Sequence, residues 1–526
     1  MWILELPPFV PFLAIAFILL FTSGRLTGCL LILAPVWGIL NLWQSAPQAV
    51  WHFSLFELQL TPIRFDSLSL VFGYIFHLIG FIAIVYALHV RDKMQQLATL
   101  IYTSAALGAV FAGDLLTLFI FWELMAISSV MLIWARRKPQ SFACGFRYFV
   151  YQFISGLLLL FGTFFYWHQY GTLAFSEMDL QGIGTWLIFI AFGIKCAFPM
   201  LHTWLTDAYP EATPSGTVLL SALTTKVAVY ALARGFAGTE YLIYIGAVMT
   251  CFPIFYAVIE NDLRRVLAFS LINQLGFMVV GIGIGTELAL NGAVAHAVND
   301  ILFKSLLFMS MGAVLHMTGR IKGSELGGLY KTMPKTTVLC IIGAASISAF
   351  PLFNGFVSKS MVMTAVLEQG YNGIWLALLF ASAGVFHHAG IKIPYFAFFG
   401  HDSGLRTKDP PFNMLFAMTL AAGLCLAIGI YPSLLYRYLP YELDYSPYDM
   451  SHVLAQTQLL FFAALAFAWL NIRGIYPPEL AATNLDVDWI FRRWLPSLWS
   501  SLNSKLFRLD RHVRRVSLVK IRQWMS

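Results

Sequence analysis

Ionisable residues in the middle of long apolar stretches are the feature that most constrains this chain. Five stretches carry such a central charge, and four of the five charges are lysines: Glu123, Lys195, Lys226, Lys304 and Lys359. A charge at the centre of a bilayer costs at least about 2.5–3.5 kcal/mol. A lysine near a helix end would cost less, because its long side chain can reach the headgroups. Five such residues in one chain favour a path for protons or ions.

The composition indicates the class of protein. The 526 residues are 59% hydrophobic and 11% charged, whereas soluble domains are about 25% charged. We therefore expect a polytopic membrane protein. The net charge of +7 fits cytoplasmic loops and a basic tail, so it implies no nucleic-acid partner. The six cysteines are scattered and lack CxxC spacing, so we expect neither a disulfide framework nor a metal site.

Apolar runs of roughly 17–25 residues are the unit to count in a helical membrane protein. About 14–15 such runs lie between residues 9 and 472, which predicts an all-α integral membrane protein with that number of transmembrane helices. The stretch 46–67 is shorter and mixed in composition. We expect it to lie outside the membrane.

Loop charges predict the orientation. When the N-terminus is placed outside, most loop arginines and lysines fall on one side, and the other side receives only Arg64, Arg234 and Arg437. Cytoplasmic loops carry an excess of basic residues. We therefore predict a multi-pass protein of the plasma or inner membrane, with its N-terminus outside and its C-terminus in the cytoplasm.

The C-terminal tail, residues 486–526, is strongly basic. Its apolar residues recur at spacings of three and four, which lines one face of a helix: Leu502, Leu506, Leu509, Val513 and Val516. A basic amphipathic helix lies on the inner membrane surface or against a partner. The alternative is a partly disordered basic tail.

Two predicted helices contain a proline in mid-span beside a lysine. The first carries Lys195 and Pro199, and the second carries Pro351, Gly355 and Lys359. Both prolines stand in the tripeptide AFP. Proline lacks the backbone donor that a helix needs, so each helix should break there. Freed carbonyl groups at membrane depth require a wet or protein-filled cavity, and paired interrupted helices are typical of inverted-repeat transporters.

The apolar stretch 290–316 contains three ionisable residues on one helical face. His296, Asp300 and Lys304 follow one another at intervals of four residues, which aligns their side chains along the helix. A single histidine would be read as a core residue. In a row with an acid and a base inside a membrane, it favours a proton relay.

Three long segments resemble a known family. They read HTWLTDAYPEATPSGTVLLSALTTKVAVYALAR, NDLRRVLAFSLINQLGFMVVGIGIG and FPLFNGFVSKS. These segments resemble the antiporter-like membrane subunits shared by respiratory complex I (NADH:quinone oxidoreductase) and Mrp-type Na+/H+ antiporters, most closely the D-type Mrp subunits. The resemblance runs from about residue 65 to 435. It implies two inverted repeats of five helices, each with a broken helix, and a midplane chain of protonatable residues.

The resemblance also implies a division of the chain. Helices 1–3 occupy residues 1–95, the first repeat (helices 4–8) 96–235, and the second repeat (helices 9–13) 236–400. The C-terminal transmembrane helices occupy 401–475, and the basic amphipathic cytoplasmic tail occupies 476–526.

Roles are implied for individual residues of the first repeat. Glu123 resembles the fifth-helix glutamate that pairs with the seventh-helix lysine, here Lys195. Lys226 resembles the eighth-helix lysine that connects the two halves. We expect it in an unbroken helix, with only Thr224 and Thr225 as adjacent polar residues.

In the second repeat, His296 and Lys304 match the eleventh-helix relay, and Lys359 matches the twelfth-helix site that leads to the far half-channel. Many members of the family carry histidine where this chain has Asp300, which leaves the charge state of the relay open there. An ion pair between Asp300 and Lys304 would hold the lysine charged and slow proton exchange.

These features predict a proton-translocating membrane subunit of a multi-subunit cation/proton (Na+/H+) antiporter. The alternative is a proton-pumping membrane-arm subunit of a complex I-like or hydrogenase-like redox complex, or of an inorganic-carbon uptake system. The expected partners are other membrane subunits of such an assembly, the lipid bilayer, protons and a monovalent cation. We expect no cofactor or catalytic redox site, because GIGIG at 281–285 lacks the full GxGxxG pattern and His387 and His388 are adjacent residues.

Overall fold

The computed structural model describes residues 6–22, 24–44, 50–55, 58–477, 479–480 and 484–525. The chain divides into two compact units, Met1–Ala482 and Thr483–Ser526. The first unit is a bundle of apolar helices. Eleven helices within the described ranges are long and apolar enough to cross a membrane, and three shorter apolar helices accompany them. The expected all-α membrane fold is confirmed.

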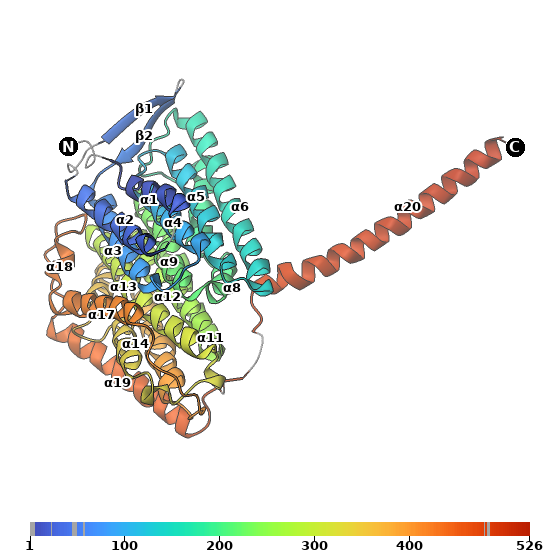
Figure 1. Ribbon diagram of the computed structural model, residues 1–526. Helices are drawn as coiled ribbons and strands as arrows, with labels where there is room; N and C mark the ends of the chain where they lie inside the picture. Colours follow the sequence, from blue (N-terminus) through green and yellow to red (C-terminus); the bar gives the residue numbers. More distant parts are fainter. Residues whose placement is uncertain are drawn as a thin grey trace. The chain divides into compact units, whose positions relative to one another are not determined.

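The bundle begins with three helices and one hairpin. The helices are α1 (Val10–Phe21), α2 (Arg25–Gln44) and α3 (Ser67–Ala87). The antiparallel strands β1 (Val50–Leu55) and β2 (Leu58–Arg64) fill most of the stretch between α2 and α3, and Figure 1 shows the hairpin at one end of the bundle. The side chain of Asp66 accepts a hydrogen bond from the amide of Ser69 and so caps α3.

Two groups of helices follow. The first comprises α4 (Lys93–Phe111), α5 (Leu115–Trp134), α6 (Pro139–Tyr170), α7 (Ile183–Lys195), α8 (Thr203–Glu211), α9 (Pro214–Ala222) and α10 (Thr224–Gly235). The second comprises α11 (Glu240–Ile259), α12 (Leu263–Ile284), α13 (Glu287–Thr318), α14 (Pro334–Ile347), α15 (Asn354–Glu368) and α16 (Asn372–Val385), which continues into the π-helical segments η4 (Phe386–Lys392) and η5 (Tyr395–Phe399). The short 3₁₀ turns η2 (Gly323–Glu325) and η3 (Leu329–Lys331) link α13 to α14.

The two groups repeat the same local structures. Asp114 caps α5 and Asp262 caps α12, and each aspartate also forms an isolated β-bridge to the segment after the next helix, at Ala174 and Lys322. The helices between, α6 and α13, are both 32 residues long and both end at a glycine in the left-handed region. These correspondences are those of two five-helix repeats.

Each repeat contains the predicted break. The first break separates α7 from α8, and the second separates α14 from α15. Ala197 and Met200 flank the first AFP proline at φ 61° and 68°, and Ala349 and Leu352 flank the second at φ 58° and 72°. Non-glycine residues rarely adopt such angles. The same strained turn therefore occurs twice, and it frees the last carbonyl groups of α7 and α14 from helical hydrogen bonding.

The helix that carries Lys226 differs from the sequence prediction. It is not unbroken, because α9 ends at Ala222, Leu223 leaves the α-helical pattern, and α10 begins at Thr224. The interruption stands three residues before Lys226. This third break gives the lysine a free carbonyl group to contact.

After the repeats come α17 (Phe412–Ile430), α18 (Ser433–Tyr436) and α19 (Met450–Ile472). The long helix α13 runs through the interior of the bundle (Figure 1), and its residues from Ala289 to Val314 are all buried. The second unit contains η6 (Ile490–Trp494) and α20 (Leu495–Met525). The tail therefore forms a helix. The predicted apolar face remains a prediction, because the side chains of Leu509, Val513 and Val516 lie outside the described residues.

Candidate functional site

A buried ion pair joins the two repeats. Lys226, the third residue of α10, lies with its amine 2.5 Å from a carboxylate oxygen of Asp300 on α13, and neither side chain has exposed surface. The same amine donates a hydrogen bond of 2.9 Å to the carbonyl group of Ser221, which the interruption of the helix leaves free. A buried charge needs this combination of a countercharge and hydrogen bonds.

The ion pair corrects the expectation for Asp300. The carboxylate pairs with Lys226 of the first repeat, and the amine of Lys304 instead donates a hydrogen bond of 2.9 Å to the hydroxyl group of Ser270 on α12. Both Lys304 and Lys359 still lie within electrostatic reach of Asp300. One carboxylate thus acts on three buried lysines, and Lys226 is the one that contacts it.

His296 stands one turn before Asp300 on α13. Its ring nitrogens lie 3.0 Å from the hydroxyl group of Ser358 and 3.1 Å from the side-chain oxygen of Gln274. Asn299 extends this network, because its amide donates to Ser358 and to the backbone carbonyl group of Asn354. The histidine therefore bridges α12 and α15, on the face of α13 that also carries Asp300 and Lys304.

Each lysine beside a predicted break contacts a backbone carbonyl group. The amine of Lys359 donates a hydrogen bond of 3.0 Å to Ile347, the last residue of α14, and lies 5.1 Å from the centre of the Phe277 ring. The amine of Lys195 donates a hydrogen bond of 2.9 Å to Trp122 on α5 and lies 4.2 Å from the centre of its ring. Carbonyl oxygens and aromatic faces both attract a cation.

Glu123 and Lys195 interact electrostatically, yet they form no ion pair within 4 Å in the part of the chain that the structure describes. One carboxylate oxygen of Glu123 lies against Gly156 of α6, where a β-carbon would overlap it. That oxygen has no hydrogen-bond partner among the described residues. The structure therefore brings the two residues near each other, and a direct contact requires a side chain to move.

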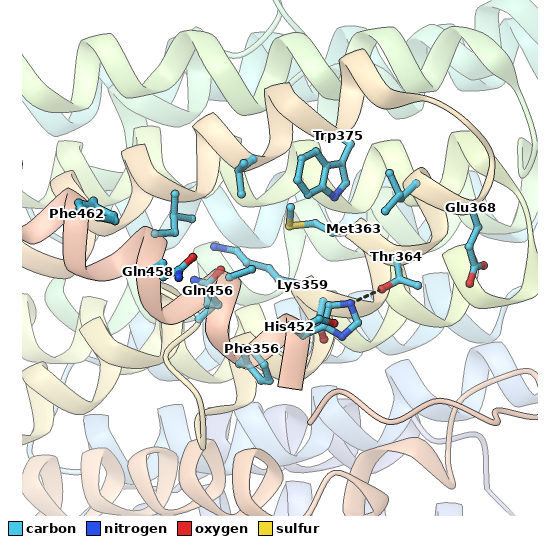
Figure 2. Close-up of a pocket in the computed structure, with 17 residues that line it drawn as sticks. Phe356, Lys359, Met363, Thr364, Glu368, Trp375, His452, Gln456, Gln458 and Phe462 are labelled. Atoms are coloured by element: carbon cyan, nitrogen blue, oxygen red, sulfur yellow. Dashed lines mark hydrogen bonds between the residues drawn. The ribbon is translucent and has the colours of Figure 1, made fainter. Parts of the chain in front are cut away.

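A cavity of about 710 Å³ opens beside Lys359, between α15, α16 and α19. Figure 2 shows Lys359 in the middle of its wall and Glu368, the last residue of α15, at one end. His452 of α19 contacts Thr364 of α15 in the lining of the cavity, with its ring nitrogen 3.2 Å from the threonine hydroxyl group (Figure 2). Gln456 lies one turn further along α19 and also lines the cavity. The cavity gives Lys359 a partly polar route toward the end of α15.

Sequence reasoning missed a second buried ion pair. The amine of Lys392 in η4 lies 2.8 Å from the carboxylate of Glu479, and the two side chains have exposed fractions of 0% and 5%. Lys392 interrupts the apolar run 374–399 as the other lysines interrupt theirs, so the same signal was available. Among the described residues, no group of three or more histidines, cysteines, aspartates or glutamates is arranged to hold a metal ion.

The fold and the buried row of charges define a polytopic membrane protein of the ion-translocating type. The family described as NADH:quinone oxidoreductase/Mrp antiporter, TM, matches residues 112–386, more than half of the chain. The chain belongs to this family.

Individual relatives come from both branches of the family. The A-type subunit of the Na(+)/H(+) antiporter of Alkalihalophilus pseudofirmus is 29% identical over 424 residues, which are 70% of this chain and 52% of the relative. The L-type subunit of the NADH-quinone oxidoreductase of Campylobacter jejuni is 28% identical over 559 aligned positions, which cover 97% of this chain and 92% of the relative. This chain therefore spans about half of the antiporter relative and nearly all of the oxidoreductase relative.

A solved structure agrees in fold. A chain of the Mrp complex from Dietzia sp. superposes with a TM-score of 0.82 at 25% sequence identity, and the match covers 98% of this chain and 61% of that chain. The fold and the family are therefore established together.

Proposed function

We propose that this chain is a proton-translocating membrane subunit of a multi-subunit cation/proton antiporter. The ion pair between Lys226 and Asp300 carries the proposal, because it joins the two repeats by a titratable contact that no solvent reaches. A buried ion pair often stabilises a fold no more than apolar residues of similar volume do, so stability alone does not explain this one. It also lies between Lys195 of the first repeat and Lys304 and Lys359 of the second, which are all buried, and this favours a role in moving charge.

The proposed route links buried groups of both repeats, and on α13 it includes His296 and Lys304, which stand on either side of Asp300. Protons enter the first repeat near Glu123 and Lys195, pass to Lys226 and Asp300, and continue through Lys304 and His296 to Lys359. Thr225 Oγ1, Ser305 Oγ and one side-chain oxygen of Asn299 are buried without hydrogen-bond partners in the described part of the chain. Buried polar atoms of this kind are commonly satisfied by ordered water, which would complete the hydrogen-bonded route.

Opening of the central pair is the proposed switch. While Asp300 contacts Lys226, its charge acts on Lys304 and Lys359 only from a distance. When the pair opens, the carboxylate is available to Lys304, and Lys226 loses its countercharge and can release its proton. An ion pair at 4 Å is worth about 4 kcal/mol at an effective dielectric constant of 20. Moving one charge through 100 mV takes about 2.3 kcal/mol, so the two energies are comparable.

A second candidate is a proton-pumping subunit of a redox-driven complex. The near-complete alignment with the Campylobacter jejuni oxidoreductase relative favours it. The two candidates share the same internal proton path and differ in what drives it, which depends on neighbouring subunits.

Vesicles from cells that express the chain with its genomic neighbours test both candidates. We expect a pulse of Na+ or another monovalent cation to dissipate or build a pH gradient in wild-type vesicles, and Asp300→Asn to abolish the effect at matched abundance. A gradient that forms only with an electron donor such as NADH would select the redox-driven candidate. Proton movement of wild-type rate in assembled Asp300→Asn vesicles would refute the proposed path.

A further inference from the structure

His388 is a buried titratable residue that the proposed path does not use. It lies in the π-helical segment η4, and its side chain has no exposed surface. The ring lies close to the carbonyl group of Gly384. Neither ring nitrogen meets the geometry of a hydrogen bond with any of the described residues. An imidazole in this state favours water as its partner.

The internal repeat gives His388 a counterpart. Lys226 is the third residue of α10, which begins directly after the interruption at Leu223. His388 is the third residue of η4, which begins directly after α16 ends at Val385. Each of the two segments belongs to the last helix of its repeat. Each repeat therefore places an ionisable side chain at the third position after regular α-helix is interrupted, by a turn in α9–α10 and by a π-helical segment after α16. Such π-helical turns frequently mark functional sites.

The charged neighbours of His388 come from two directions. Lys304 of α13 acts on its ring electrostatically, and so do His387 and Lys392 of η4 itself. Lys304 belongs to the central row, where its amine contacts Ser270 of α12. Lys392 lies one turn further along η4 and contacts Glu479. His388 thus stands between the central row and a second buried ion pair.

That second pair lies at the C-terminal end of α11. The amine of Lys392 donates hydrogen bonds to the carbonyl groups of Val258 and Glu260, at the C-terminal end of α11, at 2.7 Å and 2.6 Å. The first turn of α12, which follows α11 after a short loop, carries Arg264 and Arg265. The distribution of basic residues therefore predicts that this end lies in the cytoplasm. Burial raises the pKa of Glu479, and the charge of Lys392 opposes the shift without cancelling it. Glu479 can therefore accept a proton more readily than a solvated glutamate.

We propose that His388 relays protons between the buried ion pair of Lys392 and Glu479 and the amine of Lys304. One ring nitrogen accepts a proton that a chain of water molecules delivers from beside Glu479, and the ring then releases a proton, through intervening water, to the neutral amine of Lys304. The imidazole returns to its neutral form and Lys304 becomes an ammonium, so each transfer conserves charge. This inference rests on the proposed function, and it gives the second repeat a proton entrance of its own.

The test uses vesicles that contain the full chain and its neighbouring subunits. We expect His388→Ala to lower the proton flux at least about tenfold at matched abundance, since a positioned proton donor contributes on the order of a hundredfold or more. Millimolar imidazole on the membrane face that carries the start of α12 should restore part of the flux. His388→Lys should retain flux with a displaced pH optimum, because it keeps a titratable group where the first repeat has Lys226. If His388 had only a structural role, neither added imidazole nor the lysine substitution would restore the proton flux.

The matched control is His77→Ala. His77 of α3 is also buried, and its Nδ1 donates a hydrogen bond of 2.7 Å to the carbonyl group of Gly73. It lies outside the proposed path. Its replacement should leave the flux per assembled complex unchanged, with no response to imidazole.

Wild-type flux in assembled His388→Ala complexes would overturn the inference. It would also be overturned if His388→Ala lost flux, imidazole did not restore it and His388→Lys were equally inactive. If Lys304→Ala blocks transport in the same series, the proposed function survives that failure, whereas active Lys304→Ala vesicles count against the proposed function itself.

Discussion

The amine of Lys226 and the carboxylate of Asp300 meet at 2.5 Å in the interior of the bundle, one from each repeat. The first repeat ends at α10 and the second contributes α13, so this contact couples the two halves electrostatically. Its geometry depends on the interruption of the helix at Leu223, which supplies the carbonyl group of Ser221 as the second partner of the lysine.

Removing one partner of this pair should destabilise the protein. Asp300→Asn leaves a buried ammonium without its countercharge, a loss of about 3–5 kcal/mol in comparable pairs. The double variant Lys226→Met with Asp300→Leu removes both charges, so it should recover most of the melting temperature while transport stays absent. Thermal unfolding of the purified assemblies, combined with vesicle flux, measures both effects. If the double variant were less stable than either single variant, the loss of stability in Asp300→Asn would not come from leaving Lys226 without its countercharge.

The first-repeat pair makes a different prediction. Lys195→Ala should abolish proton movement without preventing assembly, and Glu123→Gln should weaken it and shift the pH optimum, because the lysine loses a nearby negative charge. Gly156→Ala should also impair transport, since a β-carbon at 156 would overlap the carboxylate of Glu123.

The control for the glycine is Gly423→Ala on α17, where a β-carbon would meet no atom within 4 Å. Flux against pH at matched abundance distinguishes these variants. Normal proton flux in assembled Lys195→Ala complexes would show that Lys195 is not part of the path. Equal losses of flux in Gly156→Ala and Gly423→Ala would show that the effect at Gly156 is not specific to Glu123.

The sequence predicted the positions of the buried charges better than their partners. A charged residue in an apolar stretch is visible in the sequence, and so are prolines that break helices, because both depend on local composition. The partner of Asp300 depends on how α10 packs beside α13. Spacing along one helix favoured Lys304, which Ser270 of a neighbouring helix engages instead.

The same limit applies to Lys392 and to the helix that carries Lys226. Glu479, the partner of Lys392, follows the last helix of the bundle, and nothing local to Lys392 points to it. No glycine or proline stands within five residues of Leu223, and Thr224 and Thr225 lower helix propensity only slightly. Local sequence alone therefore does not predict the break, and tertiary contacts of the helix contribute to it.

Stability at low pH should depend on Asp66. This residue caps α3, and both of its carboxylate oxygens accept hydrogen bonds of 2.7 Å from Arg234 of α10. Burial acts to raise the pKa of Asp66, but the hydrogen bond and charge of Arg234 lower it further, so the net pKa lies below the usual 3.8. A lowered pKa stabilises the fold fully above pH 3.8 and progressively less as the pH falls through the folded-state value.

Asp66→Asn should therefore lower the melting temperature near neutral pH, and its difference from the wild type should shrink below pH 3.8. Melting of the purified protein across this range tests the link between α3 and α10. A difference that stays constant down to pH 2 would show that the charge of Asp66 contributes nothing and that only its shape matters.

The predicted orientation can be tested by labelling. Lys138 and Ser446 are exposed and lie on opposite sides in the topology that the loop charges predict. Single cysteines at these positions, in a background without the six native cysteines, should react with a membrane-impermeant maleimide from opposite sides. We expect Ser446→Cys to label in intact cells and Lys138→Cys only after permeabilisation. Labelling of both from outside would overturn the predicted orientation.

The two lysines of the later path should respond differently to charge reversal. Lys359 lines a cavity of about 710 Å³ that also contains Glu368 and His452, so a carboxylate at 359 would have water to exchange protons with. Lys359→Glu should therefore retain flux with an altered pH profile. Lys226→Glu instead sets a second carboxylate against Asp300 where no solvent enters, and like charges in that position cannot both ionise without a large cost. It should abolish flux at every pH. Proton flux from pH 6 to 9, at matched abundance, compares the two directly. An inactive Lys359→Glu beside a normal Lys226→Glu would reverse the roles assigned to the two lysines.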